Sequence, residues 1–176
     1  MIETLFILLT AHFLGDFVLQ PDWIVQRKRQ PQVLLLHVVL VLAASALMLG
    51  SFPLPLLLIL FGSHLAMDAL KVYLLPNGIY TFLLDQLVHI GVVCTLAYGF
   101  SNAAHAGLWL SLLPPDGQQW YLLIITCLGG FLLCVPAGGV LIGVAASPLL
   151  EEIRKDKRKR REKHPQKYVI GDVVSE

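Results

Sequence analysis

Five long apolar stretches dominate this chain and leave little choice of fold. A helix needs about 20 apolar residues to cross the roughly 30 Å hydrocarbon core of a membrane. Unpaired backbone groups are costly in lipid, which favours helices over irregular chain there. The sequence therefore predicts an all-α fold, a polytopic membrane bundle of about five transmembrane helices. The expected helices cover roughly residues 2–20, 33–50, 54–75, 79–100 and 119–146.

The composition agrees with a membrane protein. Of the 176 residues, 56% are hydrophobic and 14% are charged, and a soluble fold this apolar would aggregate. Cys94, Cys127 and Cys134 stand in apolar stretches without Cys-x-x-Cys spacing, so we interpret them as small packing residues. The amino terminus has neither a basic region nor a small-residue cleavage site. We therefore expect residues 1–20 to be a retained helix and not a signal peptide.

Proline and glycine interrupt the last apolar stretch at residues 135–139. Proline removes a backbone hydrogen bond inside a helix and bends it. We therefore expect a kink there, or a second half that lies at the membrane interface.

Basic residues indicate which loops are cytoplasmic. The 21–32 loop carries Arg27, Lys28 and Arg29, whereas the 50–54 and 101–118 loops carry no Lys or Arg. Eight more basic residues follow between Arg154 and Lys163. Because short cytoplasmic loops are rich in Lys and Arg, we expect an outside amino terminus and a cytoplasmic carboxyl terminus.

The sequence divides into a transmembrane domain, residues 1–150, and a basic cytoplasmic tail, residues 151–176. Acidic residues are interspersed in the tail, so we expect a solvated helix near the anionic headgroups of membrane lipids. The net charge of the whole chain is only +1, and nothing indicates a nucleic-acid partner.

Three pairs of His and Asp inside the apolar stretches carry the strongest functional signal. Ionisable side chains are costly in a membrane, usually face the bundle interior and mark functional sites. The members of each pair stand four positions apart, which puts both side chains on one helix face. Helical metal sites present paired ligands with this spacing. The pairs are His12 and Asp16, His64 and Asp68, and Asp85 and His89.

The order within the third pair is reversed, and this reversal matches the expected topology. The helix that carries Asp85 crosses the membrane in the opposite direction to the helices that carry His12 and His64. In all three pairs the aspartate therefore lies nearer the cytoplasm, and the histidine lies about 6 Å deeper at about 1.5 Å per residue. His37 enters the same zone from the cytoplasmic end of the second helix. We predict one pocket lined by the three pairs, with His37 adjoining it.

These seven residues are ligands of the kind that transition metals prefer. Histidine with carboxylate suits a divalent metal, zinc first, with manganese or iron as alternatives. Four ligands suffice for tetrahedral zinc, so seven allow two metals, or one metal with an oriented outer shell. The cluster lacks cysteine, which favours an open catalytic site over a closed thiolate site. The alternative is a set of buried His–Asp hydrogen bonds that tie four helices together.

Other polar residues are expected to support this site. Lys71 shares nearly the same helix face as Asp68 and is a candidate catalytic residue that stabilises an oxyanion or binds a phosphate; snorkelling near a helix end is the alternative. We expect Asp16 to act as a metal ligand or as the base that accepts a proton from water. Gln20 and Gln86 are expected to donate hydrogen bonds to ligating carboxylates, or else to tie helices together.

Four further residues are expected to play ordinary roles. Gly15 and Gly62 permit close contact between helices. His105 and His164 stand in an outside loop and in the tail, and we interpret both as surface residues.

Taken together, the motifs resemble a bacterial integral-membrane family of unknown function, DUF3307. The resemblance covers about residues 5–95 and implies a shared polar site in the bacterial inner membrane, but no reaction. The pattern of His and Asp pairs on consecutive helices is more distantly similar to membrane-bound metal-dependent hydrolases. The matching elements are His12-Phe-Leu-Gly-Asp16-Phe-Val-Leu-Gln20, His37, His64-x-x-x-Asp68-x-x-Lys71 and Phe82-Leu-Leu-Asp85-Gln86-x-x-His89.

Three functions remain open. The first is a metal-dependent hydrolase that acts on a lipidic or amphiphilic substrate from the cytoplasmic leaflet, either a phosphate ester or an amide. The second is a transporter or channel for a metal ion or protons. The odd number of helices and the lack of proline at the cluster disfavour transport. The third is a metal-stabilised structural or assembly subunit.

Overall fold

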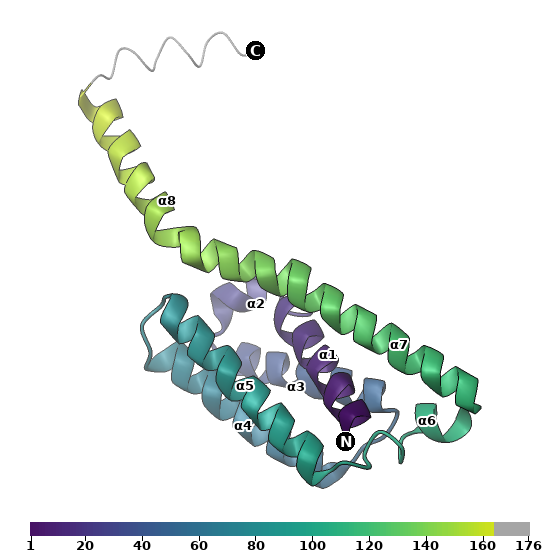
Figure 1. Ribbon diagram of the computed structural model, residues 1–176. Coiled ribbons are helices and arrows are strands. Elements are labelled where there is room, and N and C mark those ends of the chain that lie inside the picture. Colours follow the sequence, from purple (N-terminus) through teal and green to yellow (C-terminus); the bar gives the residue numbers. More distant parts are fainter. Residues whose placement is uncertain (164–176) are drawn as a thin grey trace. The chain divides into compact units, whose positions relative to one another are not determined.

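The computed structural model describes residues 1–163, and every regular element in that range is a helix (Figure 1). The first helix, α1 (Ile2–Phe17), has 16 residues and is about 24 Å long at about 1.5 Å per residue. The predicted all-helical fold is confirmed for the described residues, and where the sequence predicted about five transmembrane helices, four helical segments are long and apolar enough to cross a membrane. They are α3 (Pro31–Leu49), α4 (Leu54–Tyr73), α5 (Ile79–Gly99) and the long helical segment that begins with α7 (Pro115–Leu132).

Proline and glycine set the ends of α3. The helix begins at Pro31, a position where the missing N–H is not needed for an intrahelical hydrogen bond. It ends at Gly50, which has φ 66° and directs its N–H to the carbonyls of Ala46 and Leu47. A left-handed residue at this position favours glycine because a Cβ atom is disfavoured there.

Two short helices lie in segments that were expected to be loops. They are α2 (Asp22–Arg27) and α6 (Leu108–Leu112). Each anchors one apolar side chain in the interior, Ile24 at 1% and Leu110 at 4% exposure. Burial of these side chains stabilises single turns of helix that are too short to show a periodic pattern in the sequence.

The expected interruption of the last apolar stretch takes the form of a π-helical turn. This turn, η1 (Leu133–Ala137), contains Pro136 and joins α7 to α8 (Gly138–Lys163). A π-helical turn is wider than an α-helical turn and absorbs an irregularity without ending the helix. The backbone therefore stays helical through the interruption.

Helix α1 packs against α3, α5 and α7. A Cβ atom at Gly15 would lie 2.6 Å from Cγ2 of Val41 on α3, so the predicted close helix contact is present there. The corresponding prediction for Gly62 is wrong, because a Cβ atom at that position meets no atom within 4 Å. On its other side, α1 is tied to α7 by Thr10, whose hydroxyl donates to the carbonyl of Ile125 at 3.1 Å.

The chain divides into two compact units, residues 1–141 and the residues from 142 on. The His and Asp cluster belongs to the first unit. In the second unit, α8 is exposed beyond Pro148 and carries ion pairs between residues four positions apart. Such pairs support a solvent-exposed helix by about 0.3–0.5 kcal/mol each. The predicted surface residue His164 lies outside the described residues.

Candidate metal centre

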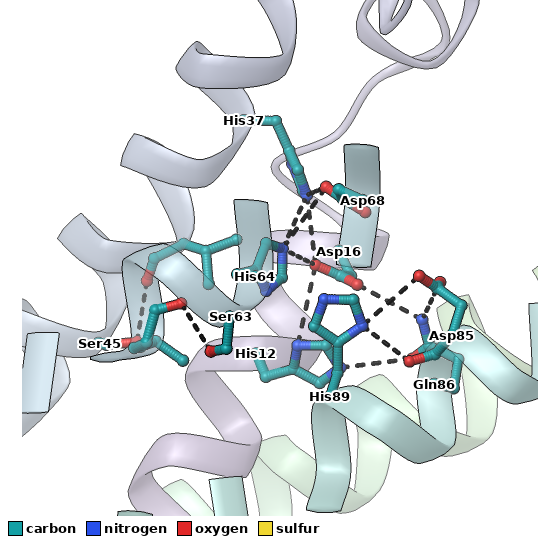
Figure 2. A network of polar contacts seen from close by, with 12 residues as sticks. His12, Asp16, His37, Ser45, Ser63, His64, Asp68, Asp85, Gln86 and His89 are labelled. Atoms are coloured by element: carbon teal, nitrogen blue, oxygen red, sulfur yellow. Dashed lines mark hydrogen bonds and ion pairs between the residues drawn. The ribbon is translucent and has the colours of Figure 1, made fainter. Parts of the chain in front are cut away.

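The seven His and Asp side chains identified in the sequence lie together in one buried cluster (Figure 2). Each of these side chains is 7% exposed or less. His37 lies in the middle of the cluster and not beside it, because it contacts both α1 and α4. The contributing residues are His12 and Asp16 on α1, His37 on α3, His64 and Asp68 on α4, and Asp85 and His89 on α5.

Four atoms from three helices form the centre of the cluster. His37 Nε2 lies 3.2 Å from His64 Nε2. It also lies 3.4 Å from Asp16 Oδ1 and 3.3 Å from Asp68 Oδ2. His64 Nε2 lies 3.4 Å and 3.7 Å from the same two oxygens. Two imidazole nitrogens and two carboxylate oxygens therefore converge on one small volume.

Five of the six distances between these four atoms match the edges of a tetrahedral metal site. Zinc binds histidine nitrogen and carboxylate oxygen at about 2.0–2.2 Å, which makes each edge of a regular tetrahedron about 3.3–3.6 Å. The five distances above range from 3.2 to 3.7 Å. His37, His64 and Asp68 thus have ligand atoms close enough together to hold one ion, and Asp16 Oδ1 lies near both imidazoles.

Several buried polar atoms of the cluster have no hydrogen-bond partner among the described residues. They include Asp16 Oδ1, Asp85 Oδ1 and His89 Nε2, together with the Nδ1 atoms of His37 and His64. A buried polar atom without a partner costs about 1–3 kcal/mol, and most such atoms in proteins are paired. A network of hydrogen bonds alone therefore leaves the cluster incompletely satisfied, whereas a bound ion provides a partner for atoms that face its interior.

Gln86 connects the carboxylates of Asp16 and Asp85, as expected for a residue that orients carboxylates. Its side-chain N–H group donates to Asp16 Oδ2 at 3.4 Å and to Asp85 Oδ2 at 3.1 Å. Its Oε1 lies 3.4 Å from His12 Nε2. Hydrogen bonds of this kind fix the orientation of metal ligands.

A buried lysine that was predicted only as a basic loop residue also contacts the cluster. Lys28 follows α2, and its Nζ lies 2.9 Å from Asp68 Oδ2 with the lysine side chain only 11% exposed. Gln20 was expected to donate a hydrogen bond to a ligating carboxylate, but it accepts one from this lysine instead. In the amide orientation that suits both neighbours, Gln20 accepts from Lys28 Nζ at 2.9 Å and donates to the main-chain carbonyl of Asp16 at 3.1 Å. The sequence feature that could have indicated the burial of Lys28 is Ile24, which precedes it by four positions and shares its helix face.

Lys71 reaches the other end of the cluster. Its Nζ lies 2.5 Å from Asp85 Oδ2, and its side chain is 32% exposed, whereas that of Asp85 is 1% exposed. The ammonium group also lies 5.7 Å from the centre of the Phe82 ring. Lys71 therefore lies at the rim of the cluster, where its ammonium group contacts Asp85 and is also partly exposed at the surface of the protein.

The charges in the cluster are not balanced by protein groups alone. The described residues supply three carboxylates, Asp16, Asp68 and Asp85, and two ammonium groups, Lys28 and Lys71. With neutral imidazoles, one negative charge remains in a buried volume, where unpaired charge is costly. A divalent cation or an imidazolium supplies the missing positive charge.

Other polar residues of the chain do not join the cluster. His105 is exposed and lies 4.0 Å from Glu3, as expected of a surface residue. Ser45 and Ser63 donate to main-chain carbonyls four positions earlier in their own helices (Figure 2). Their hydroxyls are thus occupied within the helices.

Comparison with known proteins gives one match. A family model described as "Protein of unknown function (DUF3307)" matches residues 4–111 of the chain. This range contains all seven His and Asp residues of the cluster, together with both lysines. No curated protein and no solved structure matches the chain.

Proposed function

The chain belongs to the DUF3307 family, and we propose that it is a metal-dependent hydrolase of the bacterial inner membrane. Its substrate is lipidic or amphiphilic and enters from the cytoplasmic leaflet. The observation that carries this proposal is the convergence of two imidazole nitrogens, from His37 and His64, with a carboxylate oxygen from each of Asp16 and Asp68. An all-nitrogen-and-oxygen ligand set of this kind suits zinc, with manganese or iron as alternatives.

The residues around the four central atoms support a catalytic role over a purely structural one. A divalent ion held by them supplies Lewis acidity, which polarises a substrate oxygen and makes water a better nucleophile. A cluster carboxylate or imidazole that does not hold the ion accepts the proton of the attacking water. The oxygen of that water forms the new bond to the carbonyl carbon or phosphorus, and the alcohol or amine leaves with a proton.

Lys71 is placed to act on the charge that develops during this reaction. Its ammonium group touches the cluster through Asp85 but remains 32% exposed, so a substrate that approaches the rim can reach it. A fixed positive charge beside a developing oxyanion stabilises the transition state more than the ground state. We therefore assign Lys71 to stabilisation of the substrate oxyanion or binding of its phosphate.

The proposed topology has five crossings, with α1 as the first. Helix α1 is embedded among α3, α5 and α7, and it carries His12 and Asp16, so it belongs to the same bundle. Five crossings put the basic segments 27–29 and 154–163 on the cytoplasmic side. This agrees with the tendency of Lys and Arg to gather in short cytoplasmic segments. The basic tail then lies near anionic lipid headgroups.

The second candidate function is transport of a metal ion or protons. It is favoured by a compact group of imidazole rings, in which the ring centres of His37 and His64 are 5.3 Å apart and those of His64 and His89 are 4.2 Å apart. The ring of His12 lies 5.3 Å from that of His89 and 5.9 Å from that of His64. Neighbouring ionisable groups in membrane proteins serve as proton relays. A metal-stabilised assembly subunit is the third candidate.

An assay on purified protein in mild detergent separates these candidates. The protein is stripped with a chelator, reloaded with zinc, manganese or iron, and mixed with micelles of amphiphilic phosphate esters and amides. We expect product release only from reloaded protein, with loss of release in His64→Gln and retention in the control variant His105→Gln.

A parallel assay uses the same proteins in sealed vesicles. Movement of zinc or protons across the bilayer that depends on His64, without hydrolysis of any substrate, would replace the proposed hydrolase with a transporter. Folded protein that retains no metal after loading would instead indicate a structural polar network.

A further inference from the structure

We propose that the cluster holds a second divalent ion, bound by Asp85 and His89 and bridged to the first ion by Asp68. This inference rests on the proposed function and deepens it, because it turns a mononuclear site into a two-metal centre. It is carried by the orientation of His89, by the free oxygen of Asp85 and by the shared position of Asp68.

The imidazole of His89 is oriented as a metal ligand. Its Nδ1 lies 2.8 Å from the main-chain carbonyl oxygen of Asp85, and because a carbonyl only accepts, Nδ1 must carry the ring proton. In the neutral ring the other nitrogen, Nε2, then has a free electron pair. It is buried and has no hydrogen-bond partner among the described residues. Metal-binding histidines commonly have their second nitrogen tied to a backbone carbonyl in this way.

The carboxylate of Asp85 is anchored through one oxygen and free at the other. Oδ2 accepts from Lys71 at 2.5 Å and from Gln86 at 3.1 Å. Oδ1 is buried and has no hydrogen-bond partner in the described part of the chain, and its nearest imidazole nitrogen is His89 Nδ1 at 3.6 Å. A ligating carboxylate typically has this arrangement, with outer hydrogen bonds on one oxygen and the ion on the other.

Asp68 belongs to two groups of possible ligands. In one group it joins His37 and His64, and in the other it joins Asp85 and His89. In each group one possible ligand atom from every residue lies within 4.8 Å of those of the others. In two-metal sites the ions stand about 3.5–4 Å apart, a separation that one carboxylate can bridge. The close packing of the His64 and His89 rings, whose centres are 4.2 Å apart, brings the two groups side by side (Figure 2).

The protein also supplies charge for two ions. The three carboxylates would offset three of the four positive charges of two divalent cations. Lys28 and Lys71 then leave the centre net positive. A net positive centre attracts an anionic group, so it fits a phosphate ester better than a neutral amide.

The test counts zinc ions in the intact protein. Wild type and variants are purified in mild detergent without chelator, loaded with zinc, washed by gel filtration and measured by mass spectrometry. We expect two ions per chain in wild type and in the control His105→Gln. We expect one ion per chain in His89→Gln and in Asp85→Asn, because each removes a ligand of the second ion only, and one in His37→Gln, which removes a ligand of the first.

Manganese gives a second readout that needs no variant. Wild-type protein loaded with manganese should show the magnetic coupling of two close ions in its electron paramagnetic resonance spectrum. One ion per chain in wild type, or two ions that His89→Gln leaves unchanged, would overturn the second site while the proposed hydrolase stands. No retained ion in folded wild type would overturn both.

Discussion

Replacement of Lys28 by methionine tests whether this lysine neutralises the buried charge of Asp68. The two side chains are 11% and 1% exposed and their charged atoms lie 2.9 Å apart. Removal of one partner of a buried ion pair costs about 3–5 kcal/mol, because the other charge stays buried without compensation. The small exposure of Lys28 favours the lower end, about 3 kcal/mol. For a chain of this size that corresponds to a fall of about 6–12 °C in the unfolding midpoint.

The assay is thermal unfolding in detergent, followed by circular dichroism, with chelator and with saturating zinc. With zinc bound, the ion also compensates Asp68, so we expect the loss in Lys28→Met to be smaller than with chelator. Arg27→Met is the matched control, since Arg27 is the exposed neighbour in the same basic run. Equal midpoints for the two variants in chelator would refute the assigned role of Lys28.

Three further predictions follow from individual contacts. Gly15→Ala should destabilise the protein by about 1–3 kcal/mol through overpacking against α3. Gly62→Ala should be neutral or stabilising, because its Cβ atom meets open space. Equal effects of the two variants in thermal unfolding would contradict the close packing of Gly15. Gln86→Leu should weaken zinc binding about 10–100-fold, because it removes the hydrogen bonds that orient the carboxylates; competition with a chromophoric chelator measures this, and unchanged affinity would remove Gln86 from the centre. Lys71→Met should weaken binding of inorganic phosphate to the zinc-loaded protein about 10–100-fold, because it removes a charged hydrogen bond. Titration calorimetry measures this affinity, and Lys155→Met in the exposed tail is the control. Equal affinities of the two variants would argue against an anion-binding role for Lys71.

Much of the helical arrangement was predictable from hydropathy, but short helices and the burial of single polar residues were not. Apolar stretches of membrane length located α3, α4 and α5 within a few residues of their ends. Helices α2 and α6 have 6 and 5 residues, which is too few for a periodic pattern to emerge above the loop composition around them. Their positions depend on tertiary burial of Ile24 and Leu110.

The convergence of the three pairs was predictable because it follows from spacing and helix direction alone. The central position of His37 was not, since a single histidine has no partner on its own helix to show which face turns inward. Lys28 shows a related limit, because the run of three basic residues does not itself distinguish the buried one, and only its spacing of four positions from Ile24 does. Gly62 was mispredicted for a simple geometric reason. It stands two positions before His64, so it faces away from the cluster.

X-ray absorption spectroscopy of the purified, zinc-loaded protein tests the central claim most directly, since it reports which atoms surround the metal. The imidazole and carboxylate atoms that converge around His37 and His64 predict only nitrogen and oxygen neighbours, at about 2.0–2.2 Å, with the scattering signature of imidazole. That signature should weaken in His64→Ala and persist in His105→Ala. Sulfur neighbours at about 2.3 Å, or an imidazole signature that His64→Ala leaves unchanged, would contradict a metal centre at this cluster.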